Sequence, residues 1–70
     1  MTTETQNLMT GLLDEIIRVT EIKQIYLTIP AGTFAATLME LSIQKAKEAI
    51  KNDDTIAMIQ AYEELKGYEL

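Results

Sequence analysis

The sequence contains no cysteine and no histidine, and its single serine is Ser42. Without cysteine the chain forms no disulfide and offers no thiolate to a metal ion. Without histidine it lacks a common zinc ligand and the most frequent general base. The Ser–His and Cys–His nucleophilic arrangements are therefore excluded. We predict a protein that is not an enzyme.

Acidic residues are plentiful, but their spacing does not build a site. Six of the eleven fall in adjacent pairs, at 14–15, 53–54 and 63–64. Neighbouring residues on a helix point about 100° apart, so the two carboxylates of each pair diverge. The alternating oxygen ligands and closing glutamate of a calcium-binding loop are also missing. We therefore predict no catalytic residue, no metal site and no cofactor.

The chain has no long hydrophobic run and no basic leader. No apolar stretch approaches the roughly 18 residues that a membrane-spanning helix needs. The first residues lack the basic start and apolar core of a signal peptide, and Thr2 stands where myristoylation requires glycine. We expect a cytoplasmic protein with no membrane partner.

Basic residues are few, with six Lys and Arg against eleven Asp and Glu and a net charge of −5. A protein that binds a phosphate backbone needs a basic patch or stripe. Here the cations are scattered, and only residues 45–51 hold a mild cluster. The charge therefore disfavours nucleic acid as a partner, and its simplest role is to keep the protein soluble.

Apolar residues are abundant: 47% of the 70 residues are hydrophobic and 24% are charged. This length gives one domain, residues 1–70, in which much of the chain must lie at the surface. Small domains gain stability from disulfides, a structural metal or oligomerisation. Since the first two are disfavoured here, the apolar surplus predicts self-association.

Hydrophobic periodicity predicts the first two helices. In the first, about 3–21, apolar residues recur at helical spacing from Leu8 to Val19. Pro30 then breaks the pattern, and the second helix follows at about 33–51. Its apolar residues cover an arc of about 220°, much wider than the apolar stripe of a surface helix. We expect this helix to lie at the centre of the fold.

A third helix is predicted at about 54–66. Asn52 is a residue that commonly ends helices, and Asp53 or Asp54 can accept hydrogen bonds from the first turn of the next one. Gly67 is the expected stop.

Residues 22–29 fit two structures. Ile22, Ile25, Tyr26 and Ile29 have helical spacing, which would extend the first helix and give it a second apolar face. The same stretch alternates apolar and polar residues and is rich in β-branched side chains, which favours a strand. A lone strand must pair with a strand of another molecule. Both structures predict self-association, because the helix would expose a second apolar face and the strand would need a partner strand.

With a strand at that position, residues 23–70 resemble a ribbon–helix–helix DNA-binding repressor. The resemblance spans about two-thirds of the chain and consists of alternation followed by a proline and two helices. It implies a dimer whose paired strands enter the major groove, with Gln24, Tyr26 and Thr28 facing the bases. The chain departs from the pattern in its long helix at 33–51, its extra first helix and its shortage of basic phosphate contacts.

We predict an all-α, three-helix domain that acts as a homo-oligomeric, acidic interaction module, such as a regulator, inhibitor or assembly factor. Such a size would suit a bacterial or phage accessory protein. Its partners would be itself and another protein. The alternatives are a repressor using the 24–29 strand and an oligomer that binds a small ligand between subunits. The expected oligomer interface is Ile25, Tyr26, Leu27, Ile29, Phe34, Leu38, Met39 and Ile43.

Overall fold

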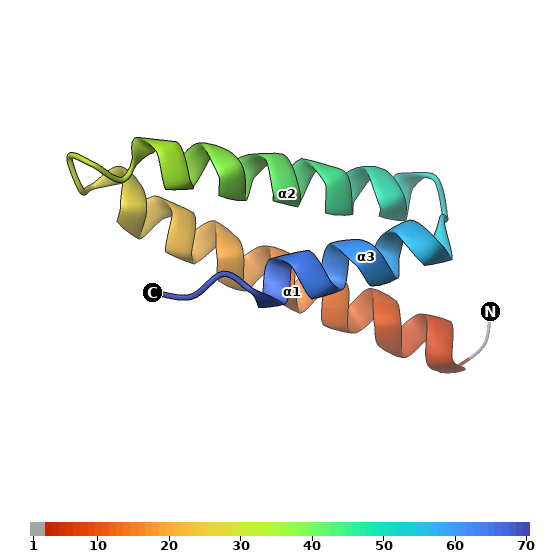
Figure 1. Cartoon of the computed structure of the whole chain (residues 1–70). Helices are drawn as coiled ribbons and strands as arrows, with labels where there is room; N and C mark the ends of the chain where they lie inside the picture. Colours follow the sequence, from red (N-terminus) through yellow and green to blue (C-terminus); the bar gives the residue numbers. More distant parts are fainter. Residues whose placement is uncertain (1–2) are drawn as a thin grey trace.

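The computed structural model describes residues 3–70, with side chains from Asn7 onward, and it consists of three helices (Figure 1). They are α1 (Thr3–Leu27), α2 (Thr33–Lys51) and α3 (Thr55–Lys66). α1 and α2 form a long antiparallel hairpin, and α3 folds back to pack against both. The bundle measures 44 × 17 × 15 Å. The prediction of an all-α, three-helix domain is confirmed.

The ambiguous stretch 22–29 continues α1 as far as Leu27, and residues 3–70 contain no strand. The strand alternative is therefore wrong for this chain. Ile22 is buried on the same line as Leu12, Ile16 and Val19, so packing against the other helices overrides the local β preference. The helix ends in a turn before Pro30, which has no N–H to donate.

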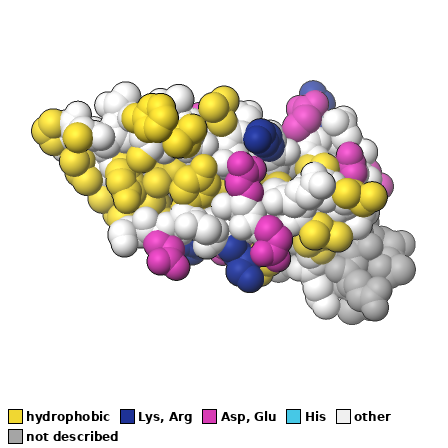
Figure 2. All heavy atoms as spheres, in the orientation of Figure 1, with side chains coloured by type: hydrophobic (Ala, Val, Ile, Leu, Met, Phe, Trp, Pro, Cys, Tyr) yellow, Lys and Arg dark blue, Asp and Glu magenta, His cyan; other side chains and the backbone are white. Residues whose placement is uncertain are grey.

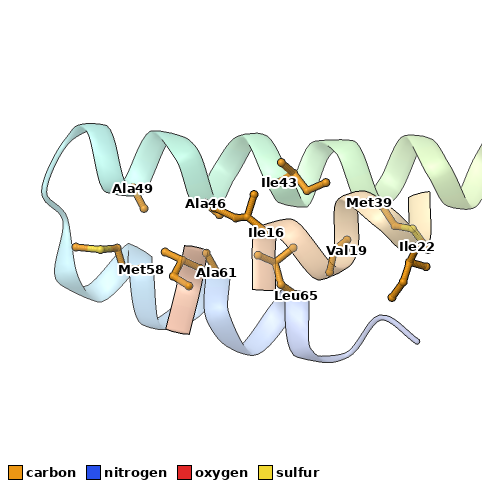
Figure 3. Packing of buried hydrophobic residues seen from close by; sticks show 11 residues of the cluster. Ile16, Val19, Ile22, Met39, Ile43, Ala46, Ala49, Met58, Ala61 and Leu65 are labelled. Carbon is orange, nitrogen blue, oxygen red and sulfur yellow. The ribbon is translucent and has the colours of Figure 1, made fainter. Parts of the chain in front are cut away.

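The core lies between the three helices along the whole length of α3 (Figure 3). Small residues of α2 alternate with larger ones, so α1 and α3 both come close to it. Tyr26 and Tyr68 pack on the edge of this cluster. The buried cluster contains Leu12, Ile16, Val19, Ile22, Met39, Ile43, Ala46, Ala49, Met58, Ala61 and Leu65.

A short turn at residues 52–54 joins α2 to α3. Asp53 has a φ of 52°, in the left-handed region that aspartate tolerates, and the Asp54 carboxylate accepts a hydrogen bond from the backbone N–H of Ala57 at 3.1 Å. Of the two aspartates offered by the sequence, Asp54 is therefore the N-cap of α3.

Replacing Asp54 with alanine is expected to lower the free energy of unfolding by about 1 kcal/mol, because the N–H of Ala57 loses its acceptor. Asp54→Asn keeps an acceptor oxygen and is expected to retain most of that stability. Urea unfolding followed by circular dichroism measures both. An Asn variant as unstable as the Ala variant would contradict the assignment of the cap.

Candidate interaction surface

The α1–α2 turn and the helix ends that flank it contain no charged residue. Residues 24–39, sixteen in a row, contain no Asp, Glu, Lys or Arg. We call this segment the hairpin tip. The charged residues that flank it, Lys23 and Glu40, form an ion pair across the hairpin, with 2.7 Å from Lys23 Nζ to Glu40 Oε1. This pair marks the boundary between the uncharged tip and the charged remainder of the molecule.

Hydrogen bonds from Lys23 and Gln44 hold the pKa of the Glu40 carboxyl below its ordinary value. Lys23 makes the larger contribution, and Glu40 therefore remains ionised at neutral pH. The ion pair thus keeps both charges directed toward each other at the base of the tip.

The tip exposes large hydrophobic side chains. Figure 2 shows hydrophobic side chains covering this end of the molecule and continuing along α2. Scattered exposed apolar residues are ordinary, but a contiguous group without charges is typical of a contact surface. The exposed large hydrophobic residues of the tip are Ile25, Leu27, Ile29, Phe34 and Leu38.

Part of this surface forms a straight line on α2. Phe34, Leu38 and Leu41 follow one another at i, i+4 and i+7, which places them on one face of the helix, and they are 75%, 41% and 56% exposed. We call these three residues the α2 stripe. Met39 and Ile43 lie on the opposite, buried face. α2 is therefore apolar on two sides, as its wide apolar arc predicts.

The segment after α3 borders the α2 stripe and is held by specific hydrogen bonds. The Tyr68 hydroxyl lies 2.9 Å from Ser42 Oγ and donates to the Leu38 carbonyl oxygen at 3.3 Å. This contact explains a serine on the buried face of α2, where an unpaired hydroxyl would destabilise the fold. Tyr26 Oη donates to the carbonyl of Glu69 at 3.4 Å.

Arg18, in α1, also binds the end of α3 and the segment that follows it. Its guanidinium donates to the carbonyl oxygens of Leu65 at 3.0 Å and Tyr68 at 2.8 Å, and it pairs with the Glu15 carboxylate at 3.0 Å. The hydrogen bond to Glu15 raises the pKa of Arg18, so the guanidinium stays charged. These bonds satisfy carbonyls at the end of α3 and fix Tyr68 beside Leu38.

The structure separates the predicted interface residues into two groups. Five are exposed on the tip, and Tyr26 is half-buried at its edge. Met39 and Ile43 are only 2% and 1% exposed, because they fill the core of the single chain, so they are corrected to core residues. Sequence reasoning missed Leu41, which completes the α2 stripe. The uncharged run 24–39 was a visible signal, but its meaning depends on the hairpin that brings its two ends together.

The residues named for DNA contact do not lie on a strand. Gln24 and Tyr26 belong to α1, and Thr28 lies in the turn, where its hydroxyl donates to the Ile25 carbonyl at 2.6 Å. The ribbon that the repressor resemblance requires is helical here, and the tip has no cation for a phosphate.

A groove and the acidic residues are the remaining surface features that could hold a ligand or an ion. A shallow groove of about 360 Å³ runs between α2 and α3, and Lys45 and Glu64 pair across it at 3.7 Å. Among the described residues, no group of three or more acidic side chains is placed to hold a metal ion. None of the helices in that part of the chain is both long and apolar enough to cross a membrane.

Comparison with known protein families, curated proteins and solved structures finds no match.

Proposed function

We propose that this chain is a non-enzymatic interaction module that self-associates through the hairpin tip. The observation that supports the proposal is the combination of sixteen consecutive uncharged residues with five exposed large hydrophobic side chains at one end of the bundle. Burying such side chains on association is favourable by about 25 cal/mol per Å² of apolar surface before the costs of association are subtracted.

The charge distribution favours a second copy as the partner. No residue of the tip is charged, Glu69 lies beside it with its carbonyl accepting a hydrogen bond from Tyr26, and the net charge of the chain is −5. Two copies that meet tip to tip keep their negative surfaces apart, whereas contact through the remainder of the bundle would bring them together. A strongly charged partner would find no complementary charge at the tip.

The molecule is large enough for such a contact. Its accessible surface is 4710 Å². A stable interface buries about 800 Å² on each partner, which is roughly one-sixth of this surface. The tip and the adjoining face of α2 make up one end of a 44 Å bundle, so a contact of this size leaves the charged half exposed.

The proposal is tested by light scattering over a range of protein concentrations. We expect the wild-type protein to form a dimer or larger oligomer and Phe34→Lys to shift it toward the monomer, since the charge would be buried at the contact. Ile56→Lys is the matched control. Ile56 is 70% exposed, close to the 75% of Phe34, and each is the second residue of its helix.

Ile56→Lys is expected to keep the wild-type mass. We expect Phe34→Lys to weaken association at least about tenfold, which corresponds to about 1.4 kcal/mol. A wild-type protein that remains monomeric at high concentration would overturn the proposal. So would two lysine variants that dissociate equally, because the tip would then have no special part in the contact.

A further inference from the structure

We propose that two copies pair by packing their α2 stripes in antiparallel orientation, with Leu38 nearest the two-fold axis. This inference rests on the self-association proposed above and adds the contacting element and its direction. The most common symmetry of a homodimer places the same patch of both copies against itself. The central residue of a self-complementary stripe then meets its own counterpart.

The spacing of the stripe fits this arrangement. Phe34 and Leu41 are seven residues apart, about 10 Å along a helix, and Leu38 lies between them. When two such stripes run in opposite directions, Phe34 of each copy meets Leu41 of the other, while the Leu38 side chains meet at the centre. The larger aromatic ring is thus opposite leucine at both ends of the contact.

The charged residues of α2 favour the antiparallel orientation of the two helices. The line of the stripe continues along α2 through Lys45 and Glu48, which are both exposed. Parallel packing would bring Lys45 against Lys45 and Glu48 against Glu48, and it would lay the two acidic halves side by side. Antiparallel packing instead places Lys45 and Glu48 of each copy against the uncharged tip of the other, so neither residue meets its own counterpart.

Among the exposed apolar faces, the α2 stripe is also the best suited to pack against a second copy. Leu13 and Ile17 share the outer face of α1 with Glu21, which follows at helical spacing, and Ile59 of α3 is followed in the same way by Glu63. The stripe is likewise followed by Lys45, four residues after Leu41, but it places three exposed large hydrophobic side chains before that charge, where α1 and α3 each place two. Its backbone at Leu38 is held by the hydroxyl of Tyr68, so little ordering is needed on binding.

The natural absence of cysteine makes disulfide cross-linking a clean test, using the full chain with single substitutions. Under mild oxidation we expect Leu38→Cys to form a covalent dimer at least about tenfold faster than Ile56→Cys, which reports random collision, because held thiols have a high effective concentration. Phe34→Cys and Leu41→Cys are expected to cross-link slowly alone and rapidly when mixed. That mixed product is specific to the antiparallel direction, since a disulfide needs Cα atoms within about 7 Å.

Light scattering on the same samples separates the two proposals. Rapid cross-linking of Phe34→Cys with itself and of Leu41→Cys with itself would show parallel packing and overturn the inference. Slow cross-linking of all variants in a protein that is dimeric by mass would place the contact elsewhere and also overturn it, while self-association would stand. A monomeric mass throughout would overturn both.

Discussion

Replacing Leu12 with alanine is expected to lower the free energy of unfolding by about 3 kcal/mol. The Leu12 side chain is 0% exposed and belongs to the cluster between the three helices. Its truncation removes buried apolar contacts and leaves a cavity that the close-packed helices fill only in part. A domain of this size has only about 5 kcal/mol of stability, so this single change removes more than half of it. Urea unfolding followed by circular dichroism measures the loss.

The adjacent residue provides the matched control. Leu13 is also a leucine inside α1, but its side chain is 45% exposed. Leu13→Ala makes the same chemical change with the same effect on helix propensity, so the difference between the variants isolates burial. We expect Leu13→Ala to cost less than about 1 kcal/mol. Equal losses would show that α1 is rotated about its axis relative to the packing described above.

The helix boundaries at 33–51 and near 54–66 could be predicted because their signals are local. Pro30 cannot donate to a helix, and Asp54 supplies the oxygen that the start of α3 needs. Both effects act within a few residues of the chain, so the sequence pattern contains them. The observed α2, Thr33–Lys51, has the predicted bounds, and α3 starts at Thr55 because Asp54 is its cap.

The state of residues 22–29 could not be decided locally. The β-branched residues there favour a strand by a fraction of a kcal/mol each, whereas burying Ile22 and packing Tyr26 against the cluster favours the helix by more. That second contribution exists only when α2 lies alongside. In the same way, the wide apolar arc of α2 predicts two buried sides but does not say which residues face the partner helices. The sequence therefore predicts Met39 and Ile43 at the interface, whereas both lie in the core.

Contacts between residues that are far apart in the sequence have no spacing pattern from which they could be predicted. Arg18 binds the carbonyl of Tyr68, fifty positions later, and Tyr68 in turn pairs with Ser42. A single arginine, tyrosine and serine carry no spacing that reveals these bonds. They depend on the length of α3, which ends well before the hairpin tip and leaves the following residues to lie beside Leu38.

Replacing Gly32 with alanine is expected to lower the free energy of unfolding by about 2–3 kcal/mol. Gly32 is buried in the α1–α2 turn, where its N–H donates to the Ile29 carbonyl at 2.9 Å. Its φ of −89° is open to any residue, so the requirement for glycine is one of space. A Cβ atom there would lie 2.0 Å from the Tyr26 carbonyl oxygen and 2.9 Å from its carbon. The backbone at the end of α1 would have to move.

Gly67→Ala is the control for the effect of removing a glycine. Gly67 has a φ of −73°, and a Cβ atom there would meet the Glu64 carbonyl oxygen at 3.4 Å, an ordinary contact. We expect this variant to be as stable as the wild type or more stable by about 0.5 kcal/mol, because alanine restricts the unfolded chain. Thermal unfolding of the two variants side by side measures the difference. If Gly32→Ala unfolds at the same temperature as Gly67→Ala, the turn accommodates a methyl group by relaxing. That result would show that the close approach of the Tyr26 carbonyl does not determine the shape of the tip.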